Sequence, residues 1–139
     1  MSSSKQYKVL PFGRFEKEAS AIIKAYPAFK IDLENFKKLL VTNPEQGEHL
    51  GSGVYKARVE ITGKATGKSY GARIIHAIFS IAEEVLLLKV YDKSKTKDLS
   101  KQELQHIREL AGEIRSEKNK RIQDQSKKAS RSKPRFNRG

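Results

Sequence analysis

Residues 53–93 constrain the fold of this chain more than any other stretch of its 139 residues. Three segments within it, residues 54–61, 72–81 and 85–91, are rich in β-branched and aliphatic side chains, which favour strands. The sequences TGKATGKSYG and AEE separate the segments and have the composition of turns. The stretch therefore predicts three consecutive antiparallel strands joined by two turns.

The first two of these strands differ in how their faces are composed. Alternate residues of the first strand are apolar on one face, whereas the other face carries Lys56, Arg58 and Glu60 and is mainly cationic. The second strand is apolar on both faces, with Arg73 at its entrance. A strand that is apolar on both faces is expected at the centre of a sheet.

Two amphipathic helices are predicted before these strands. In residues 14–26 and again in residues 28–41, apolar side chains recur every three or four positions, and Pro27 separates the two runs. A short strand is expected at residues 6–10, and residues 43–52 have the composition of a loop. A helical hairpin with apolar stripes needs a sheet face to cover, and the strands supply one.

A last helix is predicted from Ser100 onward. The sequence Ser-Lys-Gln-Glu places Glu103 three residues after Ser100, which is the pattern of a capping box. Its apolar stripe ends near residue 114, so packing against the core should end there. Residues 115–125 are expected to extend the helix into solvent, and residues 126–139 have the low hydrophobicity and high charge of a disordered arm. The chain is thus expected to form one α+β domain, residues 1–114, followed by a basic extension, residues 115–139.

The charge of the chain is strongly basic and unevenly distributed. The formal net charge is +13, and from residue 115 onward ten Lys or Arg residues face only two acidic residues. A basic balance on this scale favours a polyanionic partner. RNA or DNA is expected ahead of a membrane, because no long helix combines a basic face with a broad apolar one.

The composition argues against several other classes of function. The chain has no cysteine, which excludes disulfides, thiolate metal sites and thiol nucleophiles. Its three histidines, His49, His76 and His106, are far apart and lack the spacing of metal ligands, so no metal or other cofactor is expected. No signal peptide or membrane-spanning run is evident, and a cytoplasmic protein is expected.

Three segments, in this order, carry a resemblance to a known family. They are NPEQGEHLGSGVYKARV, GKSYGARIIHAIF and LLLKVYDKSKTKDLSKQEL. Over roughly residues 6–114 the chain resembles the RelE/ParE superfamily of toxins, and it is most similar to the HigB-type and RelE-type enzymes that cleave mRNA. The resemblance implies a small twisted sheet of about four mainly antiparallel strands, packed against the N-terminal helical hairpin and followed by a C-terminal helix.

The resemblance also implies an activity. The chain would be the toxin of a type II toxin–antitoxin module, a metal-independent endoribonuclease that cleaves translated mRNA on the ribosome by attack of a ribose 2′-hydroxyl on the adjacent phosphate. By similarity, Lys56, Arg58 and Arg73 would be the catalytic residues. Arginine suits stabilisation of phosphate charge because its guanidinium offers paired donors, and Lys56 is the candidate for proton transfer.

Further residues are expected to contact RNA by the same resemblance. They are Lys68, Tyr91, Lys93 and Lys95. Several RelE-type enzymes place a tyrosine or histidine near the chain end to stack on a base, and this sequence has no clear match; Tyr91 and His76 are the available substitutes. The basic extension is also longer than the family leads us to expect.

Two alternatives to the ribonuclease remain open at this stage. ParE-like toxins inhibit DNA gyrase without cutting RNA, and a protein of this fold could also bind RNA without cleaving it. The convergence of cations at Lys56, Arg58 and Arg73 favours the ribonuclease. The expected partners are a cognate antitoxin, the ribosome with its mRNA, and ribosomal RNA through the basic extension, with no membrane partner.

Overall fold

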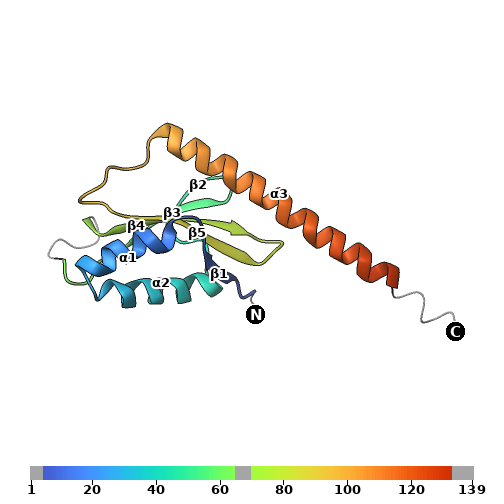
Figure 1. Ribbon diagram of the computed structural model, residues 1–139, viewed down its shortest axis with the longest axis horizontal. Helices are drawn as coiled ribbons and strands as arrows, with labels where there is room; N and C mark the ends of the chain where they lie inside the picture. Colours follow the sequence, from blue (N-terminus) through green and yellow to red (C-terminus); the bar gives the residue numbers. More distant parts are fainter. Residues whose placement is uncertain (1–4, 65–69, 133–139) are drawn as a thin grey trace.

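The computed structural model describes residues 5–64 and 70–132. Three layers make up the fold: a central sheet, the helices α1 and α2 on one face, and the long helix α3 on the other (Figure 1). The elements in chain order are β1 (Lys8–Pro11), α1 (Phe15–Ala25), α2 (Phe29–Thr42), β2 (Glu48–Gly51), β3 (Val54–Val59), β4 (Ala72–Phe79), β5 (Glu84–Asp92) and α3 (Lys101–Ser132). The predicted α+β class and the helical hairpin are confirmed.

The sheet has five strands in the order β1-β5-β4-β3-β2. Strands β3, β4 and β5 form the predicted antiparallel meander with β4 at its centre, and β1 pairs with β5 in parallel. The prediction of about four strands missed β2, whose residues fall within the loop predicted at residues 43–52. This strand is short, polar and interrupted by glycine, so it shows no periodicity; it forms because it pairs with β3 along the sheet edge.

Two apolar cores stabilise the layers, one on each face of the sheet. The stripes of α1 and α2 bury Phe15, Phe29 and Leu40 against alternate residues of β3, β4 and β5. The opposite face of β4, with Ile75 and Phe79, packs under α3. Because β4 is buried on both faces, it forms the rigid centre on which the other strands are aligned.

Helix α3 begins with the predicted capping box and continues further than predicted. The Ser100 hydroxyl accepts a hydrogen bond from the backbone N–H of Glu103 at 3.0 Å, and the Glu103 carboxylate accepts one from the Ser100 N–H at 2.9 Å. The helix extends to Ser132, so the expectation of a disordered arm is wrong for residues 126–132. Residues 115–132 contain no Gly or Pro and are rich in Lys, Arg and Gln, which lose little in a helix. None of the helices in the described ranges is long and apolar enough to cross a membrane.

Polar contacts dock α3 beyond residue 114, where its predicted apolar stripe ends. Arg115 donates to the carbonyls of Ser52 at 2.8 Å and Ile78 at 2.9 Å, and its guanidinium lies 5.0 Å from the centre of the Phe79 ring. One turn later Lys118 forms an ion pair with Glu84. Packing against the domain therefore ends near residue 118 rather than at residue 114.

His76 is a buried histidine that joins the sheet to the segment before β2. Its side chain is fully buried, and its Nε2 lies 2.8 Å from the carbonyl oxygen of Pro44, to which it donates. The ring stacks on Tyr55 and meets the edge of Phe36. Burial lowers the pKa of His76 to about 4, so the neutral ring is the form that the folded state holds.

This histidine should make the free energy of unfolding depend on pH. In the unfolded chain His76 takes up a proton near pH 6.5, whereas in the folded chain it resists protonation down to about pH 4. The free energy of unfolding should therefore fall as the pH drops from about 6.5 to about 4, by about 3 kcal/mol in total. The free energy of unfolding of His76→Gln, measured in urea between pH 7.5 and 4.5, should not show this fall. The control His106→Gln, at an exposed site on α3, should show it as the wild type does. Parallel pH profiles for both variants would contradict the assignment.

Candidate functional site

The largest concentration of predicted site residues lines one open cleft of about 610 Å³. Lys56 and Arg58 come from β3, Arg73 from β4, and Lys93 from the start of the connection between β5 and α3. The rest of the lining comes from α2, from the segment before β2, from β2 and β3, and from the β5–α3 connection: Phe36, Leu39, Gln46, Gly47, Glu48, Ala57 and Asp98. Four cationic side chains thus converge from three separate segments of the chain.

The register of the sheet explains why the two arginines meet. Arg58 on β3 lies directly opposite Arg73 on β4, and Tyr91 on β5 lies opposite Arg73 on its other side. Directly opposed residues in an antiparallel pair share a face, and like charges in such a pair are destabilising. Arg73 is only 5% exposed, whereas Arg58 is exposed. Two opposed arginines in the lining of one cleft are suited to a ligand with negative charge.

Asp98 is a member of this cleft that the sequence analysis missed. Its carboxylate accepts a hydrogen bond from Lys93 Nζ at 2.9 Å and one from the Tyr91 hydroxyl at 3.2 Å, and it lies 3.9 Å from Lys56 Nζ. The hydrogen bond from Lys93 and the charge of Lys56 hold the pKa of Asp98 below its usual value. Asp98 is one acidic residue near the end of a lysine-rich connection. No periodic pattern in the sequence indicates that its side chain lies in the cleft. Asp98 links both lysines of the cleft to one carboxylate.

Lys56 is held from two sides. Besides Asp98, the Glu48 carboxylate of β2 lies 4.0 Å from its Nζ, as the pairing of Glu48 with Lys56 across β2 and β3 requires. The Lys56 ammonium is therefore positioned by one acidic residue from the sheet edge and one from the β5–α3 connection. Both acidic residues are half-exposed or more, so each pair contributes little to stability.

The remaining predicted RNA contacts lie elsewhere. The Tyr91 side chain is 5% exposed and packs in the core under α3, where burial and the Asp98 charge raise its pKa to about 12. Lys95 lines a separate cavity of about 290 Å³ between α1 and the end of β5, together with Glu18 and Lys89. Lys68 lies outside the described residues. His76 is buried, so its ring does not reach the cleft to stack on a base.

Gly47 fixes the wall of the cleft beside Lys56. Its backbone has φ +89°, and a Cβ placed there would lie 2.2 Å from the Lys56 carbonyl oxygen and 2.7 Å from the Ala57 Cα. Only glycine allows the segment before β2 to approach β3 this closely. The position of the Lys56 backbone thus depends on the absence of a side chain at residue 47.

Replacing Gly47 by alanine should lower the free energy of unfolding by about 3 kcal/mol, through the strained φ and the overlap with β3. Gly13→Ala is the matched control, because Gly13 also has positive φ, +61°, but a Cβ there meets nothing within 4 Å. The control should cost about 1 kcal/mol from the backbone conformation alone. Chemical denaturation of both variants measures the difference, and equal losses would show that the approach to β3 adds nothing.

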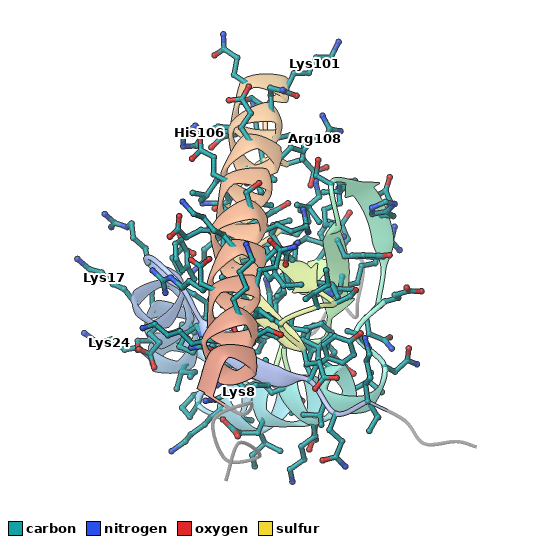
Figure 2. The ribbon with its side chains drawn as sticks, turned by 90° about the vertical axis from the view of Figure 1, so that its right-hand side faces the viewer. Lys8, Lys17, Lys24, Lys101, His106 and Arg108 are labelled. Carbon is teal, nitrogen blue, oxygen red and sulfur yellow. The ribbon has the colours of Figure 1, made fainter. Side chains whose placement is uncertain are left out.

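Helix α3 holds the turn between β2 and β3. Arg108 donates through Nε to the Leu50 carbonyl at 2.6 Å, and Arg115 bonds the Ser52 carbonyl. Figure 2 shows Arg108 on the side of α3 that faces the strands, whereas Lys17 and Lys24 point outward from α1. A Cβ added at Gly51 would lie 3.1 Å from Arg108 Nε, and one added at Gly53 would lie 2.4 Å from the Arg115 guanidinium. Side chains at these two positions would therefore crowd the arginines. The position of β2, and with it Glu48, therefore depends on the docking of α3.

Beyond Lys118 the helix extends away from the domain (Figure 1), and its sequence there carries more basic than acidic residues. Within its described side chains, those of Lys120, Arg121, Lys127 and Lys128 are basic, and Asp124 is the acidic one. A helix that is polar on all sides contributes nothing to the core. Its charge is suited to a polyanion.

A comparison with known protein families gives a match over most of the chain. Residues 37–131 match the family model described as the RelE toxin of the RelE/RelB toxin–antitoxin system, which spans the end of α2, the sheet from β2 to β5 and nearly all of α3. Among solved structures, the toxin–antitoxin complex RelBE2 from Mycobacterium tuberculosis aligns at 15% identity with a TM-score of 0.46, covering 66% of this chain and 97% of that chain. No curated protein matches the sequence.

Proposed function

This chain belongs to the RelE toxin family, within the RelE/ParE superfamily, and is a toxin of the type II toxin–antitoxin class; on that premise we propose that it is a ribosome-dependent endoribonuclease. The observation that carries the proposal is the convergence of Lys56, Arg58, Arg73 and Lys93 on one cleft. A protein that only occupies a partner's surface has no need to gather four cations around one point. An enzyme that stabilises the extra negative charge of a reacting phosphate does.

The proposed reaction uses the side chains of the cleft without a cofactor. The ribose 2′-hydroxyl attacks the adjacent phosphorus, the bond from phosphorus to the 5′-oxygen of the next nucleotide breaks, and a 2′,3′-cyclic phosphate is left. Arg58 and Arg73 donate to the phosphate oxygens as their charge increases. The attacking 2′-hydroxyl gives up its proton to solvent water, and the leaving 5′-oxygen takes up a proton from the Lys56 ammonium, whose Nζ is held in the cleft by its contacts with Glu48 and Asp98.

Asp98 has a distinct part in this proposal. In the protein alone it accepts a hydrogen bond from Lys93 and lies beside Lys56, so it offsets part of the positive charge of the cleft while no RNA is present. A phosphate that enters the cleft competes with Asp98 for the same lysines. Tyr91, bonded to Asp98 from the core, then serves to position that carboxylate rather than to stack on a base.

The proposal includes a cognate antitoxin as partner. The cleft is cationic and open, so an acidic or amphipathic antitoxin segment can bind it by charge complementarity. A segment that covers the cleft would keep RNA out. Such a segment would order as it binds. The ribosome and its mRNA are the other proposed partners.

Inhibition of DNA gyrase is the alternative function, and one pair of assays separates the two. Purified protein is added to a reconstituted translation reaction, where primer extension detects cuts in the mRNA, and to a gyrase supercoiling reaction. The ribonuclease proposal expects cuts within translated codons, dependent on ribosomes, and normal supercoiling. Loss of supercoiling without any cuts would replace the proposal with gyrase inhibition.

The basic end of α3 is proposed to bind ribosomal RNA through its charge. The variant Lys120→Gln with Arg121→Gln should weaken ribosome binding and reduce the slope of log affinity against log salt by about 1–2, because two fewer phosphates are neutralised. The control is Lys17→Gln with Lys24→Gln, which removes the same charge from α1 (Figure 2). Sedimentation with ribosomes across a salt series measures both slopes, and identical slopes would exclude this role for α3.

A further inference from the structure

One part of the cleft has no role in the phosphate chemistry. Leu39 and Phe36 of α2 line the same cavity as the four cations. The Leu39 side chain is 45% exposed, because it lies outside the apolar stripe by which α2 packs against the sheet. Phe36 is 8% exposed and forms the inner surface beside it. An exposed leucine at the mouth of a cationic cleft is a place where an apolar surface of a ligand can be covered.

A nucleotide combines the two chemical properties that this cleft recognises. Its phosphate is anionic and suits Lys56, Arg58 and Arg73, and the face of its base is flat and weakly polar and suits Leu39 and Phe36. The cleft volume of about 610 Å³ is within the range of pockets that hold small ligands. Both kinds of surface therefore line one cleft of a size that holds a small ligand.

Phe36 is held in place by its packing, and a polar group lies at the border of the apolar surface. Phe36 meets the ring of His76 edge to face, with centroids 5.9 Å apart, and His76 is bonded to Pro44. Gln46, from the same segment, donates its side-chain N–H to the Asn43 carbonyl at 3.0 Å, and its amide oxygen is oriented by that bond. A group on a base edge can donate to this oxygen.

We propose that Leu39 and Phe36 form a nucleobase subsite, which binds the base of the nucleotide whose phosphate contacts Lys56, Arg58 and Arg73. The inference rests on the proposed RNA substrate and extends it: α2 supplies the contact with the base. Leu39 is then a specificity-determining residue, because the base of the bound nucleotide packs on its side chain. Gln46 borders the subsite and reads the base edge.

The direct test is methyl NMR of the protein with a short RNA that cannot be cut. A 2′-deoxy substitution at the reacting nucleotide removes the nucleophile but keeps the base. The subsite predicts an upfield shift of the Leu39 methyl signals from the ring current of the base, and no such shift with an RNA that is abasic at this nucleotide. Ile31 is the internal control, since it is 65% exposed on the same helix and does not line the cleft.

The outcomes separate this inference from the proposed function. Shifts at the backbone amides of Lys56 and Arg58 without a shift at Leu39 would overturn the base subsite and leave RNA binding in place. An absence of shifts at all of these positions would overturn the subsite, and cleavage of mRNA on ribosomes decides the proposed function separately. In the cleavage assay, Leu39→Ala should raise the substrate concentration for half-maximal rate by about five- to tenfold, the lower end of base-stacking effects, whereas Ile31→Ala should leave it unchanged. Equal curves for the two variants would also overturn the subsite.

Discussion

Replacing Lys56 by alanine should lower the rate of mRNA cleavage by about 10²–10⁴-fold, the range that positioned proton transfer contributes. Ribosome binding should stay within about twofold, because Lys56 is one charge among many. The loss of stability should be about 1 kcal/mol or less, since its partners Glu48 and Asp98 are half-exposed or more. Single-turnover cleavage on programmed ribosomes measures the rate separately from binding.

Two further variants make the Lys56 prediction specific. Lys56→Arg keeps the positive charge but removes a group that exchanges protons, so it should remain slow if Lys56 transfers a proton. Lys24→Ala removes the same charge from the outer side of α1 and should cleave at the wild-type rate (Figure 2). A Lys56→Arg variant at full rate would reduce the role of Lys56 to electrostatics, and a Lys56→Ala variant at full rate would remove Lys56 from the mechanism.

Replacing Arg73 by glutamine should slow cleavage by about 10²–10³-fold, the effect of losing one donor to a reacting oxyanion. Arg73→Lys should recover only part of this loss, because an ammonium lacks the paired donors of a guanidinium. The control is Arg14→Gln, at an exposed position just before α1, which should leave the rate of cleavage unchanged.

Because Arg73 is 5% exposed, its variants require a separate measurement of folding. Thermal unfolding followed by circular dichroism should show a cooperative transition for Arg73→Gln, since β4 remains anchored by its apolar residues on both faces. Folded Arg73→Gln that cleaves at more than a tenth of the wild-type rate would contradict the role of Arg73. Arg58→Gln offers an independent test of the same arginine pair at an exposed position.

The sequence alone was sufficient for the meander and for the cationic face of the cleft. The two-residue period placed Lys56 and Arg58 on one face of β3, and the apolar character of both faces of β4 placed this strand at the centre. Antiparallel pairing then carries Arg73 to the same region. These are local patterns on long, regular elements, where sequence reasoning is strongest.

The remaining parts of the site depend on contacts that no local pattern encodes. Asp98 reaches the cleft because the β5–α3 connection folds back over Lys56 and Lys93. Leu39 lies outside the stripe that predicted α2, so its place in the cleft follows from the tertiary packing of that helix. Strand β2 exists because β3 offers an open edge and α3 holds the adjoining turn. Each of these features requires two distant segments to meet.

The central claim is that the cationic cleft cuts mRNA on the ribosome, and primer extension on a reporter mRNA in a reconstituted translation reaction tests it most directly. Wild-type protein should produce discrete cuts within translated codons that disappear when ribosomes are omitted, and the Arg73→Gln protein should produce none on the same time scale. An absence of cuts by the wild-type protein while ribosomes translate the reporter, or equal cuts by both proteins, would contradict the account.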